Sequence, residues 1–218
     1  MQGVPVIETP PGRENLITME SKLSGRRIAI LLTDGFEQAE MLQPRQALED
    51  AGASTDLVSP QQSEVQGWNH YEKGDKFPVN ASLESAHSGD YAGLLLPGGV
   101  VNPDHLRLLP QAVQFVQGFF KERKPVAAIC HGAWLLVEAG VLKGRTLTSW
   151  PSLKTDIRNA GGLWVDHDVV VDRGLVTSRK PDDIPAFNRR MIEVFRQSVQ
   201  TAVQTSAAGY SRDLSVLR

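Results

Sequence analysis

The sequence predicts an α/β fold: a mostly parallel sheet with helices on both faces and one sharp strand-to-helix turn. Short apolar runs alternate with longer amphipathic stretches along its 218 residues, which is typical of strand–helix–strand units. Apolar residues make up 41% and charged residues 22%, as in an ordinary globular protein. No repeat or linker divides the chain. We therefore expect one domain at 25–200, between a flexible arm at 1–24 and a tail at 201–218.

The amino-terminal half predicts strands, helices and one excursion from the sheet. Buried strands are expected at 26–32, 54–59 and 91–96, and helices at 38–51 and 111–122. Pro44 should end or kink the first turn of its helix, because proline has no N–H to donate. The polar segment 61–83, with scattered Gly and Pro, predicts an antiparallel hairpin at the sheet edge. Residues 101–109 predict a loop.

The carboxyl-terminal half continues the alternation. It predicts a central strand at 126–129, a helix that closes at Gly140, a strand at 146–149 and a helix at 153–160. Short strands follow at 164–165, 169–171 and 175–178, the last two joined by a hairpin turn at 172–174. A long helix is expected at 182–199.

The single cysteine lies where the central strand turns into a helix. Residues 128–132, Ala-Ile-Cys-His-Gly, have the small-x-nucleophile-x-Gly form of a nucleophile elbow, in which small residues let the backbone turn sharply. The amino end of the next helix favours a thiolate, so we expect a lowered pKa for Cys130. The alternative is a small buried core thiol, which would not explain why His-Gly ends the apolar run.

Three loops follow the carboxyl ends of predicted parallel strands, where sites of α/β proteins form. They are 34–37, 97–99 and 130–131. The Pro-Gly-Gly at 97–99 suits a tight backbone with inward-pointing N–H groups, although a plain turn is the alternative.

Composition excludes several classes of protein. A net charge of -2 provides no basic field, so no nucleic acid partner is expected. One cysteine cannot form an intrachain disulfide, and it suits a reducing compartment. The chain has no basic-then-apolar leader and no membrane-length apolar run, so we expect a cytoplasmic protein without a membrane partner. Asp166-His167-Asp168 is interpreted as a turn, and no metal site is expected.

The loop motifs in their order resemble the PfpI family of the class I glutamine-amidotransferase-like superfamily. The similar segments are 35–40, 95–99, 125–132, 139–145, 148–151 and 176–183. The resemblance spans roughly residues 26 to 195 and implies a single-domain flavodoxin-like sandwich. The family usually has proline after Cys-His-Gly, whereas this chain has Ala133.

The resemblance implies a role for each matching position. Cys130 would be the nucleophile, His131 the general base or acid, and Glu37 a protonated carboxyl bonded to the thiolate. Asp104 of a neighbouring subunit would orient the histidine, which implies a homodimer or higher homo-oligomer. The N–H groups of Gly99 and His131 would form an oxyanion hole. Without the resemblance, Glu37 is an ordinary acid at a helix start, Asp104 a loop acid or cap, and His131 a structural histidine.

Three functions follow as hypotheses. The first is a cysteine-dependent enzyme, without cofactor, that acts on a small-molecule carbonyl or peptide substrate as peptidase or amidase, glyoxalase or deglycase. The second is a redox or stress-response protein that uses an oxidisable thiol with no second cysteine to resolve it. The third is a holdase chaperone, and the expected flexible arm and tail are the only sequence features that support it.

Overall fold

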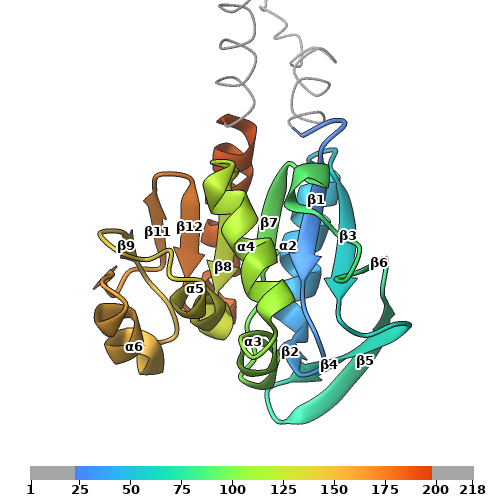
Figure 1. The fold of residues 1–218 in the computed structure, drawn as a ribbon, viewed down its shortest axis with the longest axis horizontal. Helices are drawn as coiled ribbons and strands as arrows, with labels where there is room; N and C mark the ends of the chain where they lie inside the picture. The colour runs from blue at the N-terminus through green and yellow to red at the C-terminus, as the bar shows by residue number, and fades with distance from the viewer. Residues whose placement is uncertain (1–22, 198–218) are drawn as a thin grey trace, which may run out of the picture.

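The computed structural model describes residues 23–197, and almost all of the expected arm and the whole tail lie outside that range. Its centre is a seven-stranded sheet in the order β11-β12-β8-β7-β1-β3-β6 (Figure 1). Every neighbouring pair in this sheet is parallel except β11 with β12. The predicted mostly parallel α/β fold is therefore confirmed.

The strands of the large sheet are short and mostly buried. They are β1 (Arg27–Leu31), β3 (Ser54–Ser59), β6 (Ala81–Ser82), β7 (Gly93–Leu96), β8 (Val126–Ile129), β11 (Val169–Asp172) and β12 (Leu175–Ser178). In β1 the side chains alternate between two cores: Ala29 and Leu31 belong to one, Ile28 and Ile30 to the other. This period of two explains why a strand covered on both faces is a continuous apolar run.

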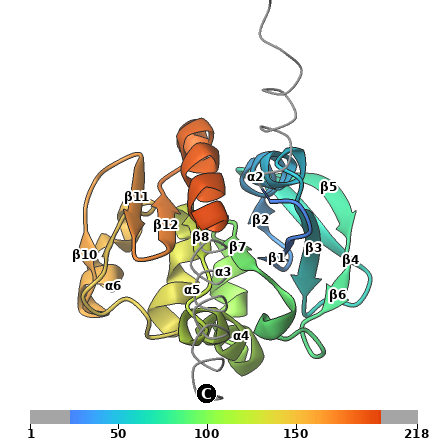
Figure 2. The ribbon, with the colours of Figure 1, turned by 90° about the horizontal axis from the view of Figure 1, so that it is seen from above.

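Helices cover both faces of the sheet, as Figure 2 shows from above. One face carries α2 (Gln38–Asp50) and the helix at 184–197; the other carries α4 (Pro110–Lys121) and α5 (Ala133–Glu138). The shorter α6 (Lys154–Asn159) lies beside β9 (Thr146–Leu147) and β10 (Leu163–Trp164), which form a small parallel sheet. The single-turn 3₁₀ helices are η1 (Ser88–Asp90), η2 (Cys130–Gly132), η3 (Pro151–Leu153) and η4 (Pro181–Asp183).

The structure departs from the sequence predictions in four elements. Of the two outcomes predicted at Pro44, an end and a kink, the end does not occur, because helix α2 continues through this buried proline. The predicted loop at 101–109 contains α3 (Val101–Leu106), where proline falls within the first turn and removes no helical hydrogen bond. The final helix begins at residue 184 after η4, and its predicted end at Val199 lies outside the described residues.

The fourth departure concerns the excursion at 61–83. Its strands β4 (Glu64–Asn69) and β5 (Glu72–Pro78) form the predicted antiparallel hairpin. The hairpin does not extend the large sheet, however. It pairs with β2 (Phe36–Glu37) in a separate three-stranded sheet. This pairing brings the hairpin tip beside the loop that follows β1.

Candidate active site

A cavity of about 440 Å³ opens at the carboxyl ends of the parallel strands. Its wall comes from six separate segments, at 37–40, 70–71, 99–100, 130–131, 150 and 180–182. Three of these segments belong to the loops that sequence analysis singled out. The hairpin tip and the segment at 180–182 complete the wall from either side.

Cys130 lies in this cavity with a left-handed backbone, at a φ of 59°. A positive φ is strained for a residue with a Cβ and is common at functional turns. A Cβ on Gly132 would lie 2.5 Å from the carbonyl oxygen of Leu96, so only glycine fits two residues after the cysteine. Cys130 is 7% exposed. The predicted elbow therefore forms, and it directs a nearly buried thiol to the cavity.

His131 is in direct contact with the thiol. Its Nδ1 lies 3.3 Å from Sγ of Cys130, and its Nε2 lies 3.3 Å from Oγ of Ser152. Burial lowers the pKa of His131 to about 4, so the imidazole is neutral near pH 7. A neutral imidazole beside a thiol can accept its proton.

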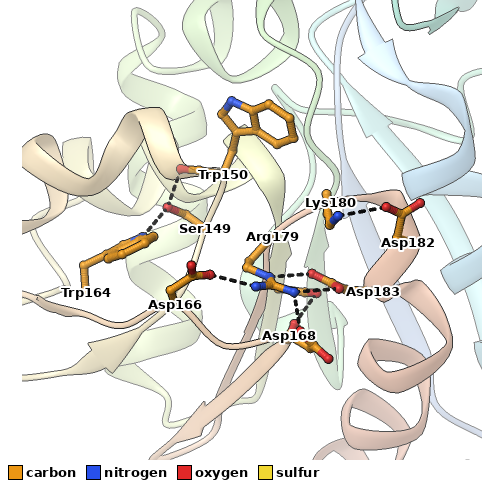
Figure 3. Close-up of polar contacts among 10 residues, drawn as sticks. Ser149, Trp150, Trp164, Asp166, Asp168, Arg179, Lys180, Asp182 and Asp183 are labelled. Carbon is orange, nitrogen blue, oxygen red and sulfur yellow. Dashed lines mark hydrogen bonds and ion pairs between the residues drawn. The ribbon is translucent and has the colours of Figure 1, made fainter.

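The indole ring of Trp150 stacks on the imidazole ring of His131. The two ring centroids are 5.9 Å apart, and the backbone N–H of Trp150 donates to the Cys130 carbonyl oxygen at 3.3 Å. Figure 3 shows the indole of Trp164 donating to Ser149, whose hydroxyl in turn donates to the Trp150 carbonyl oxygen. Trp150 also lines the cavity.

The carboxyl at the thiol is Glu40, and the assignment of this place to Glu37 is corrected. Glu40 is completely buried; it hydrogen-bonds to Cys130 and accepts the Gly98 N–H at 2.9 Å. Glu37 also lines the cavity, but its carboxylate accepts the backbone N–H of His70 at 3.0 Å and lies 3.4 Å from the His70 ring. The reason is helical geometry, because residue 37 precedes α2 whereas residue 40 faces the core.

The sequence contained a signal for Glu40. Within α2 the buried positions include Glu40, Pro44 and Leu48, at a spacing of four. An acid in register with such a stripe faces the core. Burial raises the pKa of Glu40 to about 8, so the carboxyl is protonated at neutral pH and can donate a hydrogen bond.

Burial raises the pKa of the Cys130 thiol, and the charge of an ionised Glu40 raises it further. The backbone N–H groups of His131 and Gly99 bond to the sulfur and act in the opposite direction. The raised pKa contradicts the lowered pKa expected from the helix end. The physical reason is that α5 has only six residues and begins after η2, so its dipole offsets little of the desolvation.

Asp104 lies on α3 and is exposed. Within the described part of the chain its carboxylate makes no hydrogen bond or ion pair, and Ser152 occupies the second nitrogen of His131. The structure thus brings Cys130, His131 and Gly99 together as predicted, adds Glu40 and Ser152, and leaves Asp104 on the surface.

Arg179 fixes the segment that forms one rim of the cavity. Its guanidinium bonds to Asp166 at 2.7 Å, to Asp183 at 2.8 Å and to Asp168 (Figure 3). The next residue, Lys180, pairs with Asp182 at 2.9 Å. The carboxylates of the Asp-His-Asp turn are therefore bound to an arginine. No cluster of metal-ligating side chains occurs among residues 23–197.

The chain is similar to proteins of one known family. Residues 26–194 match the model of the DJ-1/PfpI family. The chain is 41% identical over 176 residues to General stress protein 18 of Bacillus subtilis, covering 79% of this chain and 99% of that protein. It is 36% identical over 171 residues to "Putative cysteine protease YraA" of the same organism, covering 78% and 99%.

Solved structures share the fold. A two-domain protein from Anabaena variabilis with DJ-1/ThiJ/PfpI-like and ferritin-like domains superposes with a TM-score of 0.72 at 29% identity, covering 77% of this chain and 47% of that one. Drosophila melanogaster DJ-1beta superposes with a TM-score of 0.70 at 22% identity, covering 82% and 97%.

In residues 23–197 no helix has the length and apolar character that crossing a membrane requires.

Proposed function

The chain belongs to the DJ-1/PfpI family, and from that premise we propose that it is a stress-response enzyme whose Cys130 attacks small carbonyl or amide substrates. The stress role rests on its likeness to General stress protein 18, and the cysteine chemistry on the site and on its likeness to a protein named as a cysteine protease. The observation that carries the proposal is a neutral imidazole 3.3 Å from a thiol in a cavity.

The reaction begins from a thiol rather than a preformed thiolate. As Sγ of Cys130 bonds to the substrate carbonyl carbon, Nδ1 of His131 takes the thiol proton, so the attack does not require a preformed thiolate. The carbonyl π electrons move to oxygen. The N–H groups of Gly99 and His131, which face the sulfur in the free protein, are the donors for that oxyanion.

The subsequent step separates the possible subtypes. With an amide, the imidazolium of His131 returns its proton to the leaving nitrogen, and water then releases the acyl group from the sulfur. With an α-oxoaldehyde the sulfur adduct is a hemithioacetal, whose carbon-bound hydrogen moves to the neighbouring carbonyl carbon to give a thioester that water hydrolyses. A deglycase would reach the same hemithioacetal from a hemiaminal, with the amine leaving as the sulfur–carbon bond forms and the imidazolium returning its proton to the nitrogen. A cavity of about 440 Å³ has room for small molecules, and it favours them over a folded protein substrate.

As part of the same proposal, two copies of the chain together complete the active site. Exposed Asp104 is flanked on its own segment by exposed apolar side chains, namely Val100, Val101 and Leu108. Such an apolar surface around a charge favours association of two copies of the chain. In a homo-oligomer, the partner subunit's Asp104 would reach the Nε2 side of His131, where Ser152 now bonds.

A redox role is the second candidate, and one observation favours it. The only cysteine of the chain lies against a carboxyl that is protonated at neutral pH and against two backbone N–H groups. These donors suit a negatively charged sulfur oxyacid better than a neutral thiol. With no second cysteine, an oxidised Cys130 would need an external thiol for reduction.

Turnover of methylglyoxal and of small peptide amides by the wild type, Cys130→Ala and Cys130→Ser tests the enzyme proposal. We expect wild-type turnover of one class and loss of at least about 1,000-fold in both variants, with unchanged circular dichroism. Retained turnover in Cys130→Ala removes the nucleophile assignment. If neither substrate class is turned over while peroxide converts Cys130 to a sulfinate by intact mass, the redox candidate replaces the enzyme.

A further inference from the structure

A second cavity lies at the amino ends of the sheet strands, at the opposite end of β8 from Cys130. It has a volume of about 250 Å³, and its wall is made of Phe120, Arg123, Lys124, Arg145, Arg173 and Gly174. These residues come from the end of α4, the start of β9 and the β11–β12 turn, at the amino ends of β8 and β12 (Figure 1). Strand β8 separates this cavity from Cys130 by roughly 13 Å of extended chain.

Every charged residue in the wall of this cavity is a cation. Arg173 pairs with Asp172 at 2.7 Å, and Lys124 pairs with Glu122 at 2.7 Å. Arg123 and Arg145 make no ion pair within the described part of the chain. Two carboxylates therefore face four cations, and two positive charges have no partner of their own.

Arg145 is held in a fixed orientation by neutral groups. Its Nη1 donates to the carbonyl oxygens of Asp172 at 3.0 Å and Arg173 at 3.4 Å. Its guanidinium lies over the ring of Phe120, 5.1 Å from the centroid. These contacts use one nitrogen, so the other two nitrogens of Arg145 have no hydrogen-bond acceptor among residues 23–197. A guanidinium fixed in this way is preorganised to bind an oxyanion through two parallel bonds.

The cations also crowd one another. Burial and the nearby charge of Arg173 both lower the pKa of Arg145, and the charge of Asp172 offsets part of that effect. An anion placed among these groups would replace a repulsion with attractions to several cations. Arginine forks bind both carboxylate and phosphate groups, and a phosphomonoester carries about 1.5 to 2 negative charges near pH 7, which matches the two cations without an ion pair. The cavity is larger than a phosphate group alone needs.

We propose that this cavity is a binding site for the phosphate group of a small phosphorylated molecule, held by Arg145 and Arg123 with Arg173 and Lys124 at its sides. The remaining volume would hold the organic part of a phosphomonoester, next to the edge of Phe120. This phosphate site and the thiol lie at opposite ends of the sheet strands. The proposal therefore does not rest on the proposed function.

Isothermal titration calorimetry of the full chain with glycerol 3-phosphate and with inorganic phosphate tests the proposal. We expect saturable binding of the ester at least as tight as that of inorganic phosphate. Cys130→Ala should bind both probes as the wild type does, because the two sites are distinct. No saturable binding of either probe, or binding of inorganic phosphate with exclusion of the ester, overturns the proposal.

Charge-neutral variants assign the binding to this cavity. Arg145→Gln should weaken binding at least about tenfold, because charge-assisted hydrogen bonds are lost. Arg123→Gln should weaken phosphate binding about threefold. Because Arg123 is exposed and has no ion pair within the described part of the chain, this variant still tests the site if Arg145→Gln does not fold. Arg158→Gln, at an exposed arginine on α6, is the matched control. An equal loss in Arg158→Gln would mean general charge attraction and overturn the assignment.

Discussion

The Nδ1 atom of His131 lies 3.3 Å from the Sγ atom of Cys130, although the two residues are neighbours in the chain. Adjacent side chains normally diverge, and the left-handed φ of 59° at Cys130 is what turns them to the same side. The left-handed backbone conformation at Cys130 therefore brings together the thiol and the imidazole on which the proposed chemistry depends.

Replacing His131 tests that pair. His131→Gln keeps a similar size but removes the base, so we expect kcat/KM to fall by about 100-fold to 10,000-fold. Alkylation of Cys130 by iodoacetamide, followed by intact mass, should slow as well, since the imidazole no longer accepts the thiol proton. Ser152→Ala is the milder comparison, with an expected loss of about threefold to tenfold. Equal alkylation rates in wild type and His131→Gln would contradict the assignment.

Two carboxyls three residues apart give a matched pair of variants. With His131 neutral above about pH 4 and Glu40 protonated below about pH 8, wild-type kcat/KM should be highest between these values. Glu40→Gln keeps a neutral group and should abolish the decline near pH 8. Glu37→Gln should retain that decline. The opposite pattern in a pH profile would return the protonated-acid role to Glu37.

The same two groups predict how stability depends on pH. The pKa of Glu40 is raised in the folded protein, so the folded state binds more protons and stability falls as pH rises from about 4.5 to about 8. The pKa of His131 is lowered, so stability rises as pH rises from about 4 to about 6.5.

The two trends oppose each other at lower pH and leave the effect of Glu40 alone between about pH 6.5 and 8. We expect the free energy of unfolding to fall by about 2 kcal/mol across that interval. Urea unfolding at several pH values measures it. Glu40→Gln should lose the dependence, and Glu37→Gln should keep it. A flat wild-type profile between these values would mean that Glu40 ionises normally.

Asp104 tests whether the site is shared between subunits. If the partner's carboxylate orients His131, Asp104→Ala lowers activity by about tenfold, and dilution of the wild type to a monomer has the same effect. Sedimentation velocity at each enzyme concentration identifies the monomer. Asp90→Ala, at another exposed aspartate, is a control that should change neither activity nor association. Full turnover by a demonstrated monomer would remove the shared site.

Sequence reasoning succeeded where a local pattern carries the information. The segments at 54–59, 126–129 and 175–178 became strands with those same bounds, because each is too short for a helix and contains β-branched or aliphatic residues that suit a buried strand. The elbow at Cys130 was equally local, since only small residues permit such a turn. Helix α3 was missed because its six residues include a proline and are too few to show a period.

The sequence alone determined the α/β fold, the place of the thiol and the family to which the chain belongs. Only the tertiary structure decided which acid reaches that thiol, because Glu37 precedes α2 whereas Glu40 lies on the face of α2 that is buried against the core. It also decided the direction of the thiol pKa. A helix end is visible in a sequence, but the desolvation that outweighs it arises only when the folded chain buries the thiol beside a cavity lined by six separate segments.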